Sequence, residues 1–203
     1  MTTFESFLDF MDRGGFVLWP LLLLSIVTVS LVIERAWFWW RLDSRHGRAE
    51  YDRLVTVLRT GDAASLRKAA ASDRGPYAEF VRLLAVRDHP DESDAAIVAE
   101  EVRPRLERGS ILLATVVTAA PMLGILGTVV GIIQSFELLG GDATITDPSQ
   151  VSGGIAEALI STACGLVVAL IALFPLMILR GRQDRAVGRL EALASATISA
   201  SRR

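Results

Sequence analysis

Long hydrophobic stretches dominate the pattern of this chain, and three of them are long enough to cross a membrane. Residues 16–33 and 111–136 contain no charged side chain, and residues 155–179 contain one acid, Glu157. A helix needs about 20 predominantly apolar residues to cross roughly 30 Å of hydrocarbon, whereas buried helices of soluble proteins need only about 10–14. The pattern therefore predicts an all-α integral membrane protein with three transmembrane helices and helical cytoplasmic extensions and loop.

The polar segments between the spans carry shorter amphipathic patterns. Apolar stripes at helical spacing predict helices over residues 50–59 and 63–71 and from residue 77 onward. A further helix is expected to begin at Asp91 or Ser93, either of which can cap it. We expect this helix to continue without a break into the second span, although Pro104 interrupts its hydrogen bonding. No strand pattern and no internal repeat is present in the sequence.

These patterns predict an order of segments along the chain. We expect an interfacial N-terminal helix on the outside (1–13), transmembrane helix 1 (14–40), a helical cytoplasmic loop (41–110), transmembrane helix 2 (111–139), a short outside loop (140–154), transmembrane helix 3 (155–179) and a cytoplasmic helical tail (180–203).

The orientation follows from the distribution of basic residues. Residues 41–110 hold 13 lysines and arginines and residues 180–203 hold 6, whereas residues 138–154 hold none. Basic residues next to membrane spans are retained on the cytoplasmic side. We therefore expect the N-terminus outside and the C-terminus in the cytoplasm. The 13 acids of residues 41–110 balance its bases, so nucleic acid is not an expected partner.

The sequence offers little for metal or covalent chemistry. Its single cysteine, Cys164, lies inside the third span, and its two histidines, His46 and His89, are isolated in polar sequence. No Cys/His set has metal-ligand spacing, so we expect no metal and no cofactor. The loop contains no nucleophile–base pair and no phosphate-binding loop, so an enzyme is not expected.

Small residues line one face of the second and third spans. Gly124, Gly127 and Gly131 share a face of the second span, and Gly165 lies on a similar face of the third. Small side chains let two membrane helices approach closely. Two interpretations remain open: a tight hairpin between these spans, or an interface or pore shared by several subunits.

Polar groups inside the spans suggest a second role. An ionisable residue within a membrane span is a functional candidate by default, because its charge costs roughly 2.5–3.5 kcal/mol on insertion scales. Glu157 is such a residue. Other polar side chains are present in the second span (Thr128, Gln134, Ser135) and in the third (Ser161, Thr162). A threonine in a helix often bonds its hydroxyl back to a carbonyl of its own helix, so a lone threonine indicates little. Snorkelling of Glu157 towards the outer surface is the structural alternative.

Three motifs carry a resemblance to a known family. Residues 14–21 (GGFVLWPL) and 33–37 (IERAW), residues 120–132 (APMLGILGTVVGI) and residues 154–166 (GIAEALISTACGL) resemble the three spans of the ExbB/TolQ branch of the MotA/TolQ/ExbB proton-channel family. The resemblance covers almost the whole chain in order. The third span ends in ALFPLM (172–177), which differs from the ending that is usual in ExbB and TolQ proteins. This difference leaves the exact subfamily open.

The resemblance implies a multi-pass subunit of the bacterial cytoplasmic (inner) membrane. It implies a homo-oligomer, a pentamer, around an ExbD/TolR-like single-span partner whose membrane aspartate takes protons. Proton flow would drive work in the periplasm or at the outer membrane, with Glu157, Thr162 and Thr128 in the proton path. The energised process, the choice between H⁺ and Na⁺, and the partner's identity and stoichiometry are left open.

Two other classes of protein remain alternatives to this proton-driven transducer. One is a passive transmembrane scaffold in which Glu157 makes structural hydrogen bonds, and the other is a membrane enzyme. A gene next to this one that encodes a short single-span protein with an aspartate in its span would favour the transducer.

Overall fold

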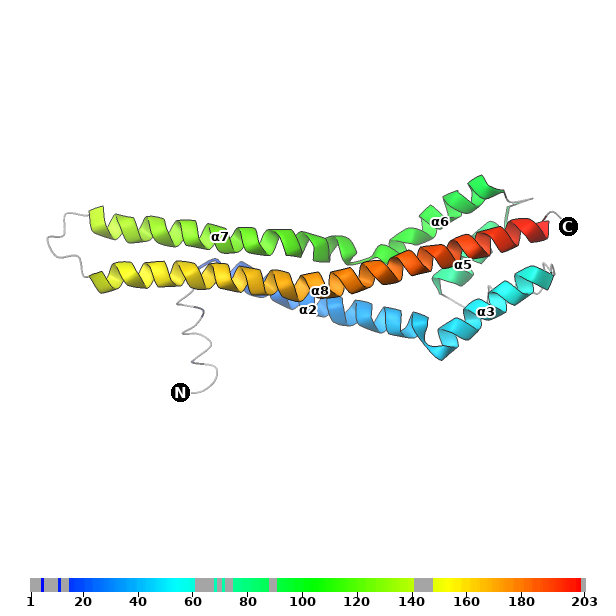
Figure 1. Cartoon of the computed structure of the whole chain (residues 1–203), viewed down its shortest axis with the longest axis horizontal. Coiled ribbons are helices and arrows are strands. Elements are labelled where there is room, and N and C mark those ends of the chain that lie inside the picture. Colours follow the sequence, from blue (N-terminus) through cyan, green and yellow to red (C-terminus); the bar gives the residue numbers. More distant parts are fainter. Residues whose placement is uncertain are drawn as a thin grey trace. The chain divides into compact units, whose positions relative to one another are not determined.

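The structure is a computed structural model of the 203-residue chain, and it describes residues 5, 11, 15–60, 68, 71, 75–87, 91–140 and 148–201. Every element in this part of the chain is a helix: α2 (Leu18–Asp43), α3 (Arg45–Thr60), α5 (Pro76–Leu84), α6 (Glu92–Glu107), α7 (Ser110–Gly140) and α8 (Pro148–Ser201) (Figure 1). The expected interfacial helix 1–13, apart from Glu5 and Met11, and the expected helix 63–71, apart from Lys68 and Ala71, lie outside the described residues.

Three helices are long and apolar enough to span a membrane, as predicted. The candidate spans are Leu18–Asp43, Ser110–Glu137 and Ser152–Ser199. Their most apolar windows are at most one-third buried inside the chain, so most of their surface is left for lipid or for other subunits. The all-α membrane fold with three transmembrane helices is confirmed.

The chain divides into two compact units. The first contains residues 1–33 and 111–176, and the second contains residues 34–110 and 177–203. Helices α2 and α8 each contribute residues to both. Each unit is described by itself below.

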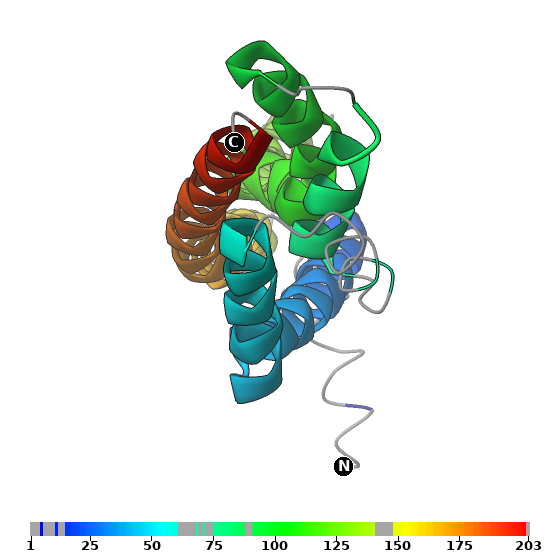
Figure 2. The ribbon, with the colours of Figure 1, turned by 90° about the vertical axis from the view of Figure 1, so that its right-hand side faces the viewer.

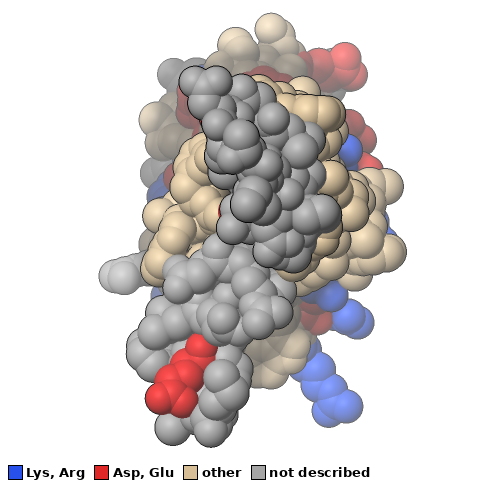
Figure 3. Space-filling view, turned by 90° about the vertical axis from the view of Figure 1, so that its left-hand side faces the viewer, with Lys and Arg blue, Asp and Glu red and all other residues tan. Residues whose placement is uncertain are grey.

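The first unit is built on the pairing of α7 with α8, which lie side by side in Figure 1. Leu113, Val116 and Ala120 of α7 and Ala158, Ala169 and Ala172 of α8 are buried. Large apolar side chains such as Ile125, Val129 and Phe174 are exposed. Exposed apolar side chains of this kind suit a lipid environment. Figure 3 views the chain from the end at which α7 stops and α8 begins, where tan residues border the grey atoms and red acidic atoms lie in the foreground.

The second unit holds the shorter helices, with α3 in cyan, α5 and α6 in green and the C-terminal part of α8 in red in Figure 2. Helix α5 packs against α6 and α3. The side chains of Phe80, Leu84, Val98 and Val102 are fully buried, and so are those of Leu190 and Leu193 from α8. Helix α5 begins after Gly75, whose extended backbone precedes Pro76 at the first helical position, where proline is favourable.

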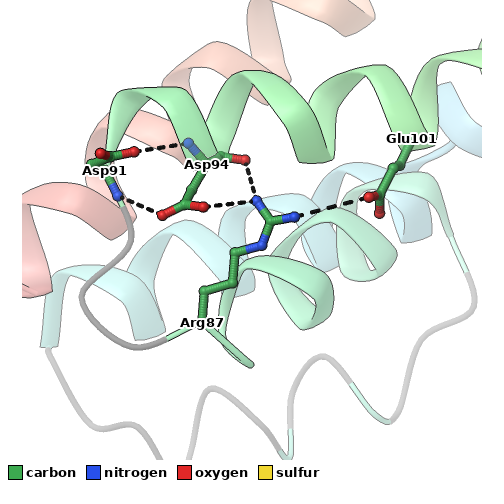
Figure 4. Close-up of polar contacts among 4 residues, drawn as sticks. All are labelled: Arg87, Asp91, Asp94 and Glu101. Atoms are coloured by element: carbon green, nitrogen blue, oxygen red, sulfur yellow. Dashed lines mark hydrogen bonds and ion pairs between the residues drawn. The ribbon is translucent and has the colours of Figure 1, made fainter.

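Helix α6 begins at a capping box. The Asp91 carboxylate accepts a hydrogen bond from the Asp94 amide at 2.8 Å, and the Asp94 carboxylate accepts one from the Asp91 amide at 3.3 Å. Arg87 donates to the Asp94 carboxylate and carbonyl at 3.0 and 2.9 Å, and it lies 3.9 Å from Glu101 (Figure 4). These reciprocal bonds give partners to two backbone amides that would otherwise lack them. The structure therefore explains why the sequence predicts the start of a helix at Asp91.

One helix prediction was wrong. Helix α6 does not run unbroken into the second span, because it ends at Glu107 and α7 begins at Ser110. Gly109 between them has φ +81°, a left-handed conformation that glycine adopts without steric cost. Pro104 lies inside α6, which continues past it to Glu107. The break therefore comes at the glycine and not at the proline.

Candidate functional site

The four glycines named from the sequence lie at the contact between α7 and α8 of one chain. A Cβ atom built on Gly124 would lie 2.9 Å from Thr162 Cα, and one on Gly131 would lie 2.9 Å from Ala158 Cβ. A Cβ atom on Gly127 would meet Ser161, and one on Gly165 would lie 3.1 Å from Gly124 Cα. Side chains at these positions would force the helices apart. Of the two open interpretations, this geometry is that of a tight hairpin.

The same contact brings Thr128 and Thr162 together. The Thr162 hydroxyl donates to the Gly124 carbonyl at 2.9 Å and lies 3.4 Å from the Thr128 hydroxyl. Thr128 donates to the carbonyl of Ile125 in its own helix at 2.6 Å. The hydroxyl of Ser161 likewise lies in the hairpin, 2.8 Å from the Ala158 carbonyl and 3.4 Å from the Gly124 carbonyl. The hydroxyls of Thr162 and Ser161 therefore lie at the same carbonyl of α7, and that of Thr128 lies next to Thr162.

Glu157 lies apart from this hydroxyl group. Five residues of helix separate it from Thr162, which is about 140° around the α8 axis. No hydrogen bond joins Glu157 to Thr128 or Thr162. The Glu157 side chain instead lies against Gly15, because a Cβ atom built on Gly15 would overlap the Glu157 carboxylate. Within the described residues the structure gives the Glu157 carboxylate no hydrogen-bond or ion-pair partner.

Glu157 also lines a cavity of about 150 Å³. The other lining residues are Gly15, Phe16 and Val17 near the start of α2 and Gly127, Val130, Gly131 and Gln134 of α7. The sequence had marked Glu157 and Gln134 as polar groups of the spans, but it had given Gly15 no role. The sequence signals for Gly15 are its place in a glycine pair directly before a span and in the motif 14–21 that carries the family resemblance.

A polar cluster in the second unit was not predicted from the sequence. Arg189 of α8 donates to the Asp43 carboxylate and the Tyr77 hydroxyl, both at 3.3 Å, and Tyr51 donates to the Arg189 carbonyl at 3.4 Å. Arg182 lies 3.9 Å from Asp43. The rings of Tyr51 and Tyr77 meet edge to face at 5.2 Å. The cluster thus joins the end of α2 to α3, α5 and α8.

Burial changes the titration of this cluster. It raises the pKa of Tyr77 above its usual range, although the hydrogen bond from Arg189 acts in the opposite direction. Burial also raises the pKa of Tyr51. The side chain of Arg189 is a guanidinium, which stays charged in proteins. At neutral pH the cluster therefore consists of neutral tyrosines around a cation and a carboxylate.

The possible metal ligands are scattered in the part of the chain that the structure describes. No group of three or more His, Cys, Asp or Glu side chains lies close enough together there to hold an ion. His46 pairs with Glu50 at 3.0 Å on the surface of α3, and Cys164 is a free, half-buried thiol.

Comparison with known proteins places this arrangement in a family. The sequence profile of the MotA/TolQ/ExbB proton channel family matches residues 77–192, which include α7 and most of α8. A Synechocystis protein named as an ExbB-like biopolymer transport protein is 34% identical over 96% of this chain and 79% of its own length. The biopolymer transport protein exbB1 of Vibrio cholerae is 29% identical over 92% of this chain and 85% of its own.

A second branch of the family gives a shorter match. The Tol-Pal system protein TolQ of Pseudomonas aeruginosa is 36% identical over 57% of this chain and 53% of its own length. The profile covers more than half of the chain and the Synechocystis protein nearly all of it, so the chain belongs to the MotA/TolQ/ExbB family, in its ExbB/TolQ branch. With its three apolar helices it is a multi-pass protein of the inner membrane.

Proposed function

We propose that this member of the MotA/TolQ/ExbB proton channel family is a subunit of a channel or motor complex driven by the proton motive force. Together with an ExbD/TolR-like partner it would couple proton flow across the cytoplasmic membrane to work in the periplasm or at the outer membrane. The relatives named as biopolymer transport proteins support this class of work.

The main support for this function is the position of three polar side chains within the segment that matches the family's sequence profile. Glu157, Thr128 and Thr162 all lie within residues 77–192, on the two helices α7 and α8. The two hydroxyls lie 3.4 Å apart, and the carboxylate faces a cavity. Carboxylates and hydroxyls are the groups through which protons pass in membrane proteins.

The surroundings of Glu157 also favour the transducer over the passive scaffold. A scaffold role would require a hydrogen bond or an ion pair from the carboxylate to a neighbouring group. Among the described residues none is seen. This fits a carboxylate that binds and releases a proton better than one that holds the fold together.

The assembly belongs to the same proposal. We expect a pentamer in which the exposed apolar faces of the spans meet lipid or neighbouring subunits, and in which a partner helix with an aspartate occupies the centre. A single subunit contributes one carboxylate to the path, so an acid from the partner would complete it. The N-terminus would lie outside and the C-terminus in the cytoplasm.

Two substitutions at one position test the proposal. Glu157→Gln keeps the shape and the hydrogen-bonding capacity of the side chain but cannot exchange a proton, whereas Glu157→Ala removes both. The tagged chain would be purified with its partner, and the partner's crosslinks to it would be compared with and without an uncoupler. We expect both variants to insert and assemble normally and to lose the response to the uncoupler.

The scaffold predicts a different pattern for the same two variants. Glu157→Gln would then behave as the parent chain, and Glu157→Ala would assemble poorly. Purification without any single-span partner that has an aspartate in its span would also contradict the proposal.

A further inference from the structure

The cavity at Glu157 is formed by one face of α7 and by the start of α2. Gly127, Val130, Gly131 and Gln134 follow the helical spacing i, i+3, i+4 and i+7, so they form a single stripe along α7. A Cβ atom built on Gly127 would lie 3.4 Å from Val17 Cβ, so α2 approaches this stripe closely. The Glu157 carboxylate enters the cavity from α8.

Gly15 is the residue that leaves room for the carboxylate. Its φ is +68°, a conformation that residues with a side chain rarely adopt. A Cβ atom there would also overlap the Glu157 carboxylate. Two independent requirements therefore select glycine at this position, one from the backbone and one from the space that Glu157 occupies.

The cavity is large enough for water. A cavity needs about 10–15 Å³ to hold one water molecule that has polar partners. With about 150 Å³, this cavity has room for several. Among the described lining residues the polar side chains are those of Glu157 and Gln134. Gln134 is exposed while Glu157 is half-buried, so Gln134 is the more accessible of the two.

A hydrated proton needs only water and one acceptor. Among the described lining residues, Glu157 supplies the acceptor, and the volume of the cavity leaves room for the water.

We propose that this cavity is an aqueous entry chamber through which Glu157 exchanges protons, with Gly15 and Gln134 as its positioning residues. The chamber lies inside one subunit and is bounded by α2, α7 and α8. Gly15 lets the carboxylate reach the chamber, and Gln134 keeps its mouth polar. The proton transfer is a simple exchange: a hydronium ion gives a proton to the carboxylate oxygen and becomes water, and the carboxylic acid later returns the proton to a water molecule, which becomes hydronium. The inference rests on the proposed function, since it describes how protons would reach the acid of that function.

The test measures whether water reaches position 157. In a Cys164→Ser background, Glu157→Cys would be treated in intact cells with a cationic, membrane-impermeant methanethiosulfonate reagent. Leu159→Cys, two residues away with a side chain 63% exposed on the apolar surface of α8, is the lipid-facing control. We expect Glu157→Cys to react at least about tenfold faster, because a thiol forms its reactive thiolate in water and not in lipid.

A second pair of variants locates the path. Gln134→Phe places an aromatic ring at the mouth of the chamber and is expected to slow the reaction of Glu157→Cys about tenfold, because the thiol loses its contact with water. Ile133→Phe adds the same ring next to it on α7, where the side chain is 51% exposed, and should have no effect. Because residues 133 and 134 are both at the surface, neither change requires the hairpin to repack.

The outcomes separate the chamber from the proposed function. If Glu157→Cys reacts no faster than Leu159→Cys, or if Gln134→Phe leaves a fast reaction unchanged, the chamber is overturned, whatever Glu157→Gln does to proton-driven work. If the labelling follows the expectation, the chamber is supported. A Glu157→Gln variant with an intact response to the uncoupler would then count against the proposed function alone.

Discussion

Thr162 donates a hydrogen bond to the carbonyl of Gly124 at 2.9 Å, across 38 positions of sequence. The bond lies where α7 and α8 are closest, since a Cβ atom on Gly124 would lie 2.9 Å from Thr162 Cα. A residue proposed for the proton path is therefore also part of the packing of the hairpin. Substitutions at Thr162 must be designed to separate these two roles.

Thr162→Val should lower the stability of the hairpin by about 0.6–1.7 kcal/mol, the range measured for hydrogen bonds between membrane helices. It should also weaken the proton-dependent response. Thr162→Ser keeps the hydroxyl and is the matched control. Thermal denaturation of the detergent-solubilised chain measures the first effect, and partner crosslinking with and without an uncoupler measures the second. A serine variant as impaired as the valine variant would indicate that the methyl group, and not the hydroxyl, is needed.

Gly127→Leu should disrupt the hairpin. A Cβ atom at this position would lie 2.7 Å from Ser161 Cβ, and a leucine side chain needs still more room. The cost should reach about 1–3 kcal/mol or more, as for other overpacked interiors. Gly153→Leu, where nothing lies within 4 Å of a built Cβ atom, is the control. Size-exclusion chromatography would report lower yield and loss of the native assembly for Gly127→Leu alone; equal profiles for the two variants would contradict the observed packing.

The second unit should lose stability in alkali because of its buried tyrosines. Burial raises the pKa of Tyr77 and of Tyr51 above the ordinary tyrosine value of about 10. The folded state therefore keeps these protons to higher pH than the unfolded state does. The free energy of unfolding should fall as pH rises above about 10 and through the raised pKa values.

Tyr77→Phe provides the test of this pH dependence. It removes one titrating group, so the decline in thermal stability above pH 10 should become shallower than in the parent chain. At neutral pH the variant should be less stable by about 1 kcal/mol, because Arg189 loses one hydrogen-bond acceptor. An unchanged slope between pH 10 and 12 would exclude Tyr77 as a cause.

Asp94→Ala should loosen the start of α6. It removes one half of the capping box and the carboxylate that Arg87 contacts at 3.0 Å (Figure 4). Loss of a helix cap costs about 0.5–2 kcal/mol. Ser93→Ala changes an exposed neighbour within the same helical turn and should have little effect. Hydrogen exchange over residues 91–98 should increase in Asp94→Ala only.

The orientation predicted from the basic residues can be checked by thiol labelling. In the Cys164→Ser background, a cysteine at Ser149 should react with an impermeant reagent in intact spheroplasts, and one at Ser93 should react only after the membrane is opened. The reason is that residues 41–110 carry 13 bases while residues 138–154 carry none. The reverse pattern would overturn the orientation.

The sequence predicted well those parts of the fold that depend on local composition. The three spans follow from the length of the apolar runs, and the start of α6 follows from Asp91 and the residues after it. The end of α6 was missed because the charged, helix-favouring sequence continues towards the span, and the break depends on a backbone conformation at Gly109.

The candidate site shows the limit of sequence reasoning more clearly. Glu157 can be chosen from the sequence because ionisable groups are rare in a span, and Thr128 and Thr162 follow from the resemblance to the family. The structure places the two threonine hydroxyls together and the Glu157 carboxylate apart from them, against Gly15. This arrangement depends on the packing of α2, α7 and α8, which the sequence does not show. The cluster around Arg189 was missed for the same reason, since its partners Asp43 and Tyr77 come from distant segments whose contact no local pattern encodes.

The hydrogen bonds of Thr128 and Thr162 have a consequence for the passage of protons. A hydroxyl carries a single proton, and those of Thr128 and Thr162 lie within hydrogen-bond distance of the backbone carbonyls of Ile125 and Gly124. When both protons are given to these carbonyls, neither hydroxyl can pass one on unless it first breaks such a bond, at a net cost of about 1 kcal/mol. In this geometry both hydroxyl protons serve the backbone of α7, and a proton on the proposed path could use either hydroxyl only after displacing one of these bonds.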